Sequence, residues 1–74
     1  GITEEMFDGF LLSQGNRCAI CKMTFVKTPC IDHDHDTEKI RGLLCRKCNL
    51  VLGYVKENVA TLNNAIEYLE KSRG

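Results

Sequence analysis

The 74-residue sequence lacks a net charge and lacks any long hydrophobic run. No stretch of aliphatic or aromatic residues exceeds three, which excludes a membrane-spanning helix, because such a helix needs about 20 apolar residues. No basic segment followed by an apolar one opens the chain, so we expect no secretory leader. Internal repeats, low-complexity segments and linkers are also absent, and the length predicts one small domain over residues 1–74.

The residues present are those of an ordinary globular chain. Hydrophobic residues make up 43% and charged residues 27%, which excludes wholesale disorder. The zero net charge hides a division, since residues 13–56 carry a net charge of +4 and the two ends together carry −4. A basic middle is compatible with phosphate binding, although an ordinary solvated surface explains the charges equally well.

Cysteine is the residue type that stands out, with five in so short a chain. A domain of this size buries only about 60% of the surface that its unfolded chain exposes, and it usually needs disulfides or a metal ion. The odd number, the expected lack of a leader and the short spacing of two pairs favour metal binding. They place the protein in a reducing compartment, the cytoplasm.

Four of the cysteines form two C-x-x-C pairs, Cys18 with Cys21 and Cys45 with Cys48, separated by 23 residues. Zinc prefers four tetrahedral ligands, and two such pairs complete its coordination shell. Because no position is left open, we expect one structural Zn²⁺. Cys30 is then expected to be a small buried apolar residue on a strand.

The periodicity of apolar residues predicts, in chain order, a helix over 4–13, short strands over 24–27, 30–34 and 40–44, a helix over 45–52 and a last helix over 58–70. Thr3 and Asn58 are suitable N-caps for the first and last helices. Gly15 is expected to end the first helix, and Gly53 to interrupt the second. The fold class is therefore a small α+β domain whose core spans residues 14–55, with a helix on either side.

The last helix carries an apolar stripe formed by Val59, Leu62, Ala65, Ile66 and Leu69. We expect this stripe to pack on the core, and a dimer contact is the less favoured alternative. Phe25 and Tyr54 are expected in the core rather than as platforms on which bases stack.

A run of alternating acids and histidines, residues 32–36, lies between the two cysteine pairs, and Asn49 directly follows the last cysteine. Such a run can be a solvated acidic turn or a loose ion site without chemistry. Its position favours phosphodiester hydrolysis instead, with the Asp32 carboxylate and the Asn49 carbonyl oxygen as ligands for a hard ion. His33 is the candidate general base, since a neutral imidazole can accept a proton from water near neutral pH.

This assignment places a condition on the strand. Asp32 and His33 are adjacent, and adjacent side chains of a regular strand point to opposite faces of the sheet. For both to serve one site, the strand must end, twist or bulge between them. Otherwise His33 and His35 share the working face.

The sequence resembles the phage recombination endonuclease VII family, a branch of the His-Me finger (HNH, ββα-metal) nucleases. The residues that carry the resemblance are Gln14-Gly15, Cys18-Ala-Ile-Cys21, Asp32-His33-Asp34-His35, Arg41-Gly-Leu-Leu-Cys45, Cys48-Asn49, Leu52-Gly53 and Glu67-Tyr-Leu-Glu70. They agree with the family in order and spacing, and they extend over nearly the whole chain.

The resemblance implies a β-hairpin followed by a helix, held by zinc on the paired cysteines. It implies a divalent-metal-dependent endonuclease in which Asp32 and Asn49 hold Mg²⁺ or Mn²⁺, His33 is the base and His35 assists. The substrate would be double-stranded or branched DNA, cut to leave 5′-phosphate ends. The setting would be a phage-infected or prophage-bearing bacterial cell, and a homodimer is possible.

Three basic residues near these motifs, Arg41, Arg46 and Lys47, are candidates for contacts with DNA phosphates, against the alternative of a solvated surface. The neutral chain lacks the large basic surface expected for tight DNA binding. A second function therefore stays open, that of a zinc-stabilised module which binds nucleic acid without chemistry. The candidate divalent-ion site formed by Asp32, His33 and Asn49 favours the enzyme, because a module that only binds nucleic acid does not need such a site.

Overall fold

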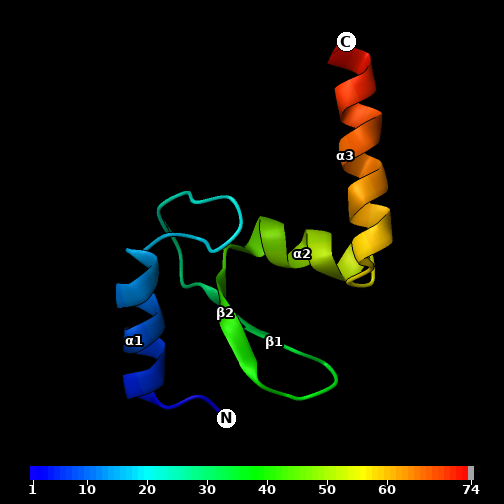
Figure 1. Cartoon of the computed structure of the whole chain (residues 1–74). Helices are drawn as coiled ribbons and strands as arrows, with labels where there is room; N and C mark the ends of the chain where they lie inside the picture. The colour runs from blue at the N-terminus through cyan, green and yellow to red at the C-terminus, as the bar shows by residue number, and fades with distance from the viewer. Residues whose placement is uncertain (74) are drawn as a thin grey trace.

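A computed structural model describes residues 1–73, which form a small α+β domain of 45 × 28 × 17 Å with a two-stranded sheet and three helices. The elements are α1 (Glu4–Gln14), β1 (Cys30–His33), β2 (Ile40–Leu44), α2 (Arg46–Tyr54) and α3 (Val59–Arg73). Figure 1 shows α1 beside the β-hairpin, α2 leaving the hairpin and α3 extending away from both. The predicted order of elements is confirmed, apart from the strand expected over 24–27.

Capping residues set the ends of α1. The Thr3 hydroxyl accepts a hydrogen bond from the Met6 amide at 3.1 Å, and two acids lie in the first turn, as the helix dipole favours. Gly15 follows the helix with a φ of +63°, a conformation that glycine adopts without a steric penalty. The predicted helix is confirmed and runs one residue further, to Gln14.

Strands β1 and β2 pair antiparallel, with a bulge between Asp32 and His33. Asp32 pairs with Gly42 and His33 with Ile40, so Arg41 is the extra residue on β2. The turn between the strands is built by Asp34, whose carboxylate accepts hydrogen bonds from the amides of Asp36 and Thr37 at 2.8 and 3.1 Å. Both hydrogen bonds lower the pKa of Asp34, and the one from the Thr37 amide has the larger effect. Asp34 is thus a turn-forming residue within the acidic run.

The side chain of Gln14 joins α1 to the sheet. Its amide nitrogen donates to the carbonyl oxygens of Arg17 and Leu43, and its Oε1 accepts from the Leu43 amide at 2.9 Å. Gln14 therefore pairs with β2 much as a neighbouring strand would. Gly42 makes room for it, because a Cβ added at Gly42 would lie 3.0 Å from Gln14 Oε1.

Gly42→Ala is expected to destabilise the domain by about 1–3 kcal/mol, because the new methyl group displaces the Gln14 amide from buried backbone groups. Gly9→Ala is the matched control. Gly9 lies within α1 and nothing approaches its Cβ position, so this variant is expected to gain about 0.5–1 kcal/mol. Urea unfolding at fixed zinc concentration measures both changes, and equal stability of Gly42→Ala and the parent would contradict the role of Gln14.

The core is small and centres on thiols. Among residues 1–73 the buried hydrophobic residues are Cys18, Leu43, Leu44 and Cys48, and half-buried Phe25 packs against the cluster that Cys18, Leu44 and Cys48 form. Two of these four belong to the C-x-x-C pairs. The fold therefore depends on how this cluster of sulfurs is held together. Cys30, which was predicted to be buried, is only half-buried on β1.

Helix α2 differs from its prediction at the C-terminal end. Cys45 is its N-cap, and the helix continues through Gly53 to Tyr54, so the expected interruption at Gly53 is wrong. A glycine within a helix costs only about 1 kcal/mol relative to alanine, which is too little to end it. Lys56 and Glu57, both with positive φ, separate α2 from α3. Tyr54 is 81% exposed at the end of α2, so its assignment to the core is also wrong.

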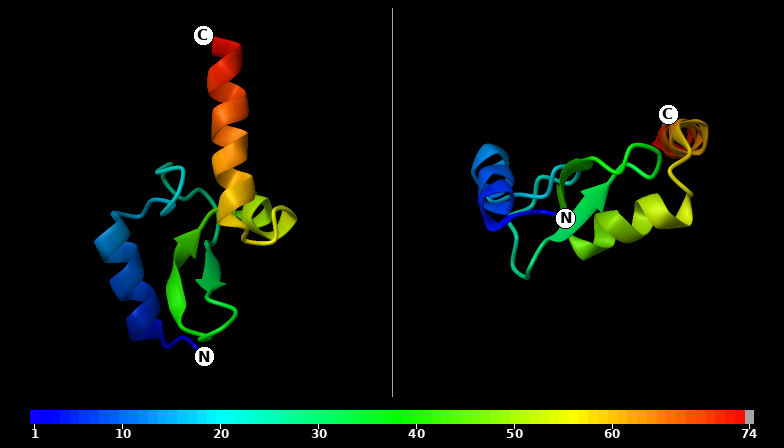
Figure 2. Two further views of the ribbon diagram at one scale, coloured as in Figure 1. Left: turned by 45° about the vertical axis from the view of Figure 1, so that its right-hand side comes forward. Right: turned by 90° about the horizontal axis from the view of Figure 1, so that it is seen from below.

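Helix α3 begins where Asn58 Oδ1 accepts a hydrogen bond from the Thr61 amide at 2.9 Å, which confirms the predicted cap. The expected packing of its apolar stripe on the core is wrong. Val59, Ile66 and Leu69 are all more than half exposed, and α3 packs against no other helix or strand of the described chain. The left view in Figure 2 shows α3 extending away from the hairpin and from α1.

The strand expected over 24–27 reduces to a single bridge between Thr24 and Arg17. The loop instead folds back through hydrogen bonds of the Cys18 amide to Met23 O and of the Phe25 amide to Asn16 O, both 2.9 Å. Within residues 1–73, no helix is long and apolar enough to cross a membrane.

Candidate active site and metal centre

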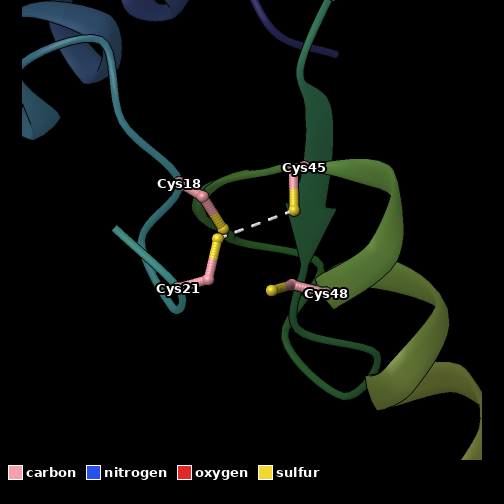
Figure 3. Close-up of side chains that lie close together, drawn as sticks. All are labelled: Cys18, Cys21, Cys45 and Cys48. Carbon is pink, nitrogen blue, oxygen red and sulfur yellow. Dashed lines mark hydrogen bonds between the residues drawn. The ribbon is translucent and has the colours of Figure 1, made fainter. Parts of the chain in front are cut away.

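The four paired cysteines meet at one point. Their sulfur atoms all lie within 4.8 Å of one another, and the Sγ atoms of Cys21 and Cys45 are 3.9 Å apart. Figure 3 shows the four side chains converging from the loop after α1 and from the start of α2. Tetrahedral zinc with sulfur ligands at 2.3 Å needs sulfurs about 3.8 Å apart. The four residues therefore fit one structural zinc ion, as their spacing predicted.

Backbone hydrogen bonds shape the first cysteine pair into a turn. The Lys22 amide donates to Cys18 O at 3.1 Å, and the Ile20 amide donates to Cys18 Sγ at 3.4 Å. Lys22 has a φ of +66°, which reverses the chain after Cys21. Amide donors directed at sulfur favour the thiolate, the form that binds a metal.

The pKa values of two thiols in the cluster are shifted in opposite directions. Burial alone would raise the pKa of Cys18, but hydrogen bonds from the backbones of Cys45, Cys21 and Ile20 lower it to about 6. Burial, together with the neighbouring sulfurs, raises the pKa of Cys48 to about 12. One thiolate thus forms readily, whereas a second buried one does not. A divalent ion removes this conflict by compensating the negative charges.

A pocket of about 500 Å³ contains the predicted catalytic trio. Asp32 and His33 line it from β1, and Asn49 lines it from α2. Strand β1 ends at His33, where its register with β2 also shifts, and both of these adjacent residues line the pocket. His35 lines the same pocket, and His33 is exposed there.

The Asp32 carboxylate already has a partner. Arg41 Nε donates to Oδ2 at 2.7 Å and Nη2 donates to Oδ1 at 3.0 Å, a bidentate ion pair. This pair directs the carboxylate of Asp32, whose side chain is only 13% exposed. A carboxylate has about four lone-pair positions, so two remain for a cation. Asp32 and Asn49 are therefore the residues of this pocket that could hold Mg²⁺ or Mn²⁺, which prefer oxygen ligands.

Glu57 is a residue that the sequence analysis missed. Its Oε1 accepts from Arg41 Nη2 at 2.6 Å, and its Oε2 lies 2.7 Å from His35 Nε2. The turn before α3 is thereby tied to β2 through Arg41 and to the hairpin turn through His35. No sequence signal pointed to Glu57, because its orientation depends on the left-handed backbone of Lys56 and Glu57, which is uncommon outside glycine.

Glu57→Ala is expected to loosen the hairpin turn while leaving global stability within about 1 kcal/mol of the parent, because the ion pairs are partly exposed. Amide exchange of residues 35–39 and 56–58 should quicken, which NMR measures directly. Glu67→Ala, a removal of the same charge from α3, is the control and should leave these amides unchanged. Equal exchange rates in both variants would contradict the bridging role of Glu57.

The three basic candidates do not lie together. Arg41 contacts Asp32 and Glu57, whereas Arg46 and Lys47 line a separate groove with residues 24–28. That groove shares no lining residue with the pocket of Asp32, His33 and Asn49. Arg46 and Lys47 therefore do not line the candidate reaction pocket, and their contact with DNA stays a prediction.

Known proteins resemble this chain over most of its length. The family described as recombination endonuclease VII matches residues 1–71. The Gene 59 protein of Mycobacterium phage D29 is 42% identical over 74 residues, an alignment that covers 96% of this chain and 45% of that protein. The Gene 59 protein of Mycobacterium phage L5 is 40% identical over 72 residues, covering 93% of this chain and 44% of that protein.

The chain spans less than half the length of either phage relative. The match to the family, in contrast, extends from residue 1 to residue 71 and includes both cysteine pairs, the acid–histidine run and Asn49. The resemblance noted in the sequence is thus confirmed, and the chain belongs to the recombination endonuclease VII family.

Proposed function

We propose that residues 1–74 form a divalent-metal-dependent DNA endonuclease domain of the His-Me finger type, with its core over residues 14–55. One observation carries the proposal: Asp32, His33 and Asn49 line a single pocket between β1 and α2. A carboxylate, an imidazole and an amide around one pocket are suited to metal-assisted hydrolysis of a phosphodiester. Membership of the endonuclease VII family supports the same activity.

Each residue of the pocket has a distinct role in this proposal. The exposed imidazole of His33 accepts a proton from the water that attacks phosphorus. The bond from phosphorus to the 3′ oxygen breaks, which leaves a 5′-phosphate and a 3′-hydroxyl. Asp32 and Asn49 hold Mg²⁺ or Mn²⁺, which when bound supplies positive charge beside the phosphate and the leaving oxygen.

Two further residues support the pocket. Arg41 orients the Asp32 carboxylate through its bidentate pair, and its hydrogen bonds to Asp32 and Glu57 raise the pKa of Arg41. His35 assists from the same pocket, held through its Nε2 by Glu57. We propose that it contacts the substrate phosphate.

The proposed substrate is double-stranded or branched DNA, and the proposed setting is the cytoplasm of a phage-infected or prophage-bearing bacterial cell. The similarity to two phage proteins supports this setting. A homodimer is a further proposal, for which the exposed apolar stripe of α3 offers a surface.

Plasmid cleavage tests the activity. Supercoiled plasmid incubated with zinc-loaded protein is expected to be nicked with Mg²⁺ or Mn²⁺ and to stay intact without an added divalent ion. Chelators are left out of the control, because they would also remove the structural zinc. A four-way junction of the same sequence, compared with the linear duplex, separates branched from simple substrates.

One observation favours the alternative of a binding module without chemistry: both oxygens of Asp32 are engaged by Arg41. If that ion pair excludes a divalent cation, the pocket cannot hydrolyse DNA. Measurable DNA binding together with intact plasmid under every ion tested would establish this alternative.

A further inference from the structure

A second groove lies on the zinc side of the molecule, between residues 24–28 and the first turn of α2. Lys27 lines one wall, and Arg46 and Lys47 line the other. Phe25 lies half-buried against the cysteine cluster, and Val26 is 95% exposed. The groove therefore combines an apolar lining with basic side chains on both walls.

The chain segments that include the groove carry basic residues and no acidic ones. Residues 9–31 and 42–56 together contain six basic residues and no acidic one. Lys27, Arg46 and Lys47 are exposed, and within the described chain none of them forms an ion pair. Even with the charge of about −2 that a four-thiolate zinc site contributes, these segments remain positive. Such a surface attracts a polyanion.

The groove also lies where a substrate would pass. Arg46 and Asn49 are three residues apart on α2, and residues at this spacing are neighbours on a helix surface. A strand whose phosphate reaches Asn49 in the reaction pocket can therefore continue across Arg46. Cys45, at the base of the groove, is one of the four clustered cysteines, so zinc fixes the wall that carries Arg46 and Lys47.

We propose that this basic groove, with Lys27, Arg46 and Lys47, binds the sugar–phosphate backbone of DNA next to the phosphate that is cut. Basic side chains on the walls match the phosphates, and the apolar lining matches the deoxyribose. The inference rests on the proposed function for its choice of DNA as the polyanion. It adds a contact surface separate from the reaction pocket and brings Lys27 into the binding surface.

Salt dependence of DNA binding tests the groove. The zinc-loaded protein is titrated into a fluorescent DNA duplex without added divalent ions, between 50 and 200 mM salt. Each of Lys27→Gln, Arg46→Gln and Lys47→Gln is expected to reduce the slope of log Kd against log salt by about 1, because each removes one phosphate contact. Lys71→Gln on α3 is the matched control and should leave the slope unchanged.

Three results would overturn the groove proposal. The first is an unchanged slope in a folded, zinc-loaded variant that carries all three substitutions. The second is a loss of slope in Lys71→Gln equal to that of the groove variants. The third is failure of the parent protein to bind the duplex. A groove that serves a protein partner instead would also leave the slope unchanged. Plasmid cleavage separates this inference from the proposed function: nicking by the parent with unchanged slopes rejects the groove alone, whereas reduced slopes without nicking reject only the nuclease.

Discussion

Cys48→Ser is expected to unfold the domain. Cys48 is buried, and it is one of two thiols among the four buried hydrophobic residues of the described chain. A structural zinc site contributes on the order of 10 kcal/mol to folding in small domains, as much as the whole stability of a typical protein. With three sulfurs left, the loop after α1 loses its tie to α2. Circular dichroism and zinc content measure the outcome, and Cys18→Ser, Cys21→Ser and Cys45→Ser should behave alike.

Cys30→Ser is the matched control. Cys30 lies half-buried on β1 and is outside the group of four clustered sulfurs. Its replacement removes a single sulfur from the sheet and no proposed metal ligand, so the variant should keep one zinc per chain and a native spectrum. If the four ligand variants matched the parent in spectrum and thermal stability, the zinc site could not be what holds this fold together.

His33→Ala is expected to lower the rate of DNA cleavage by about 10²–10⁴-fold, the contribution typical of a general base. The side chain is exposed, so its removal should leave zinc content and circular dichroism as in the parent. Single-turnover cleavage of a labelled duplex with Mn²⁺ measures the rate directly. Cleavage at the parental rate would remove His33 from the proposed chemistry.

His35→Ala provides the comparison. His35 lines the same pocket, but its Nε2 is held by Glu57. Its replacement is expected to reduce cleavage less than His33→Ala does. A larger loss in His35→Ala would reverse the two roles and would make His35, paired with Glu57, the better candidate for the base.

Most of the fold could be predicted from local sequence patterns. Thr3, Gly15 and Asn58 cap or end helices through hydrogen bonds to nearby residues, and such signals depend only on the local chain. The spacing of the cysteines likewise determined which sulfurs meet. These predictions held because each depends on geometry within a few residues or on the fixed demands of zinc.

The failed predictions concern residues whose environment depends on distant parts of the chain. Tyr54 and the stripe of α3 have the apolar character of core residues, but a core centred on the clustered cysteines is too small to cover them. Gly53 has the character of a helix terminator, yet the helix ends later, at the turn that Glu57 ties to the hairpin. From the sequence we expected an end, twist or bulge between Asp32 and His33, but the extra residue is Arg41 on the partner strand, which only the pairing of the strands reveals.

Anomalous diffraction from crystals grown with zinc and soaked in Mn²⁺ tests the central claim most directly, because the two metals are distinguished by their absorption edges. The account predicts zinc among the sulfurs of Cys18, Cys21, Cys45 and Cys48, and manganese between Asp32 and Asn49 in the pocket that His33 lines. Manganese bound elsewhere, with Arg41 still occupying Asp32 at saturating Mn²⁺, would contradict it.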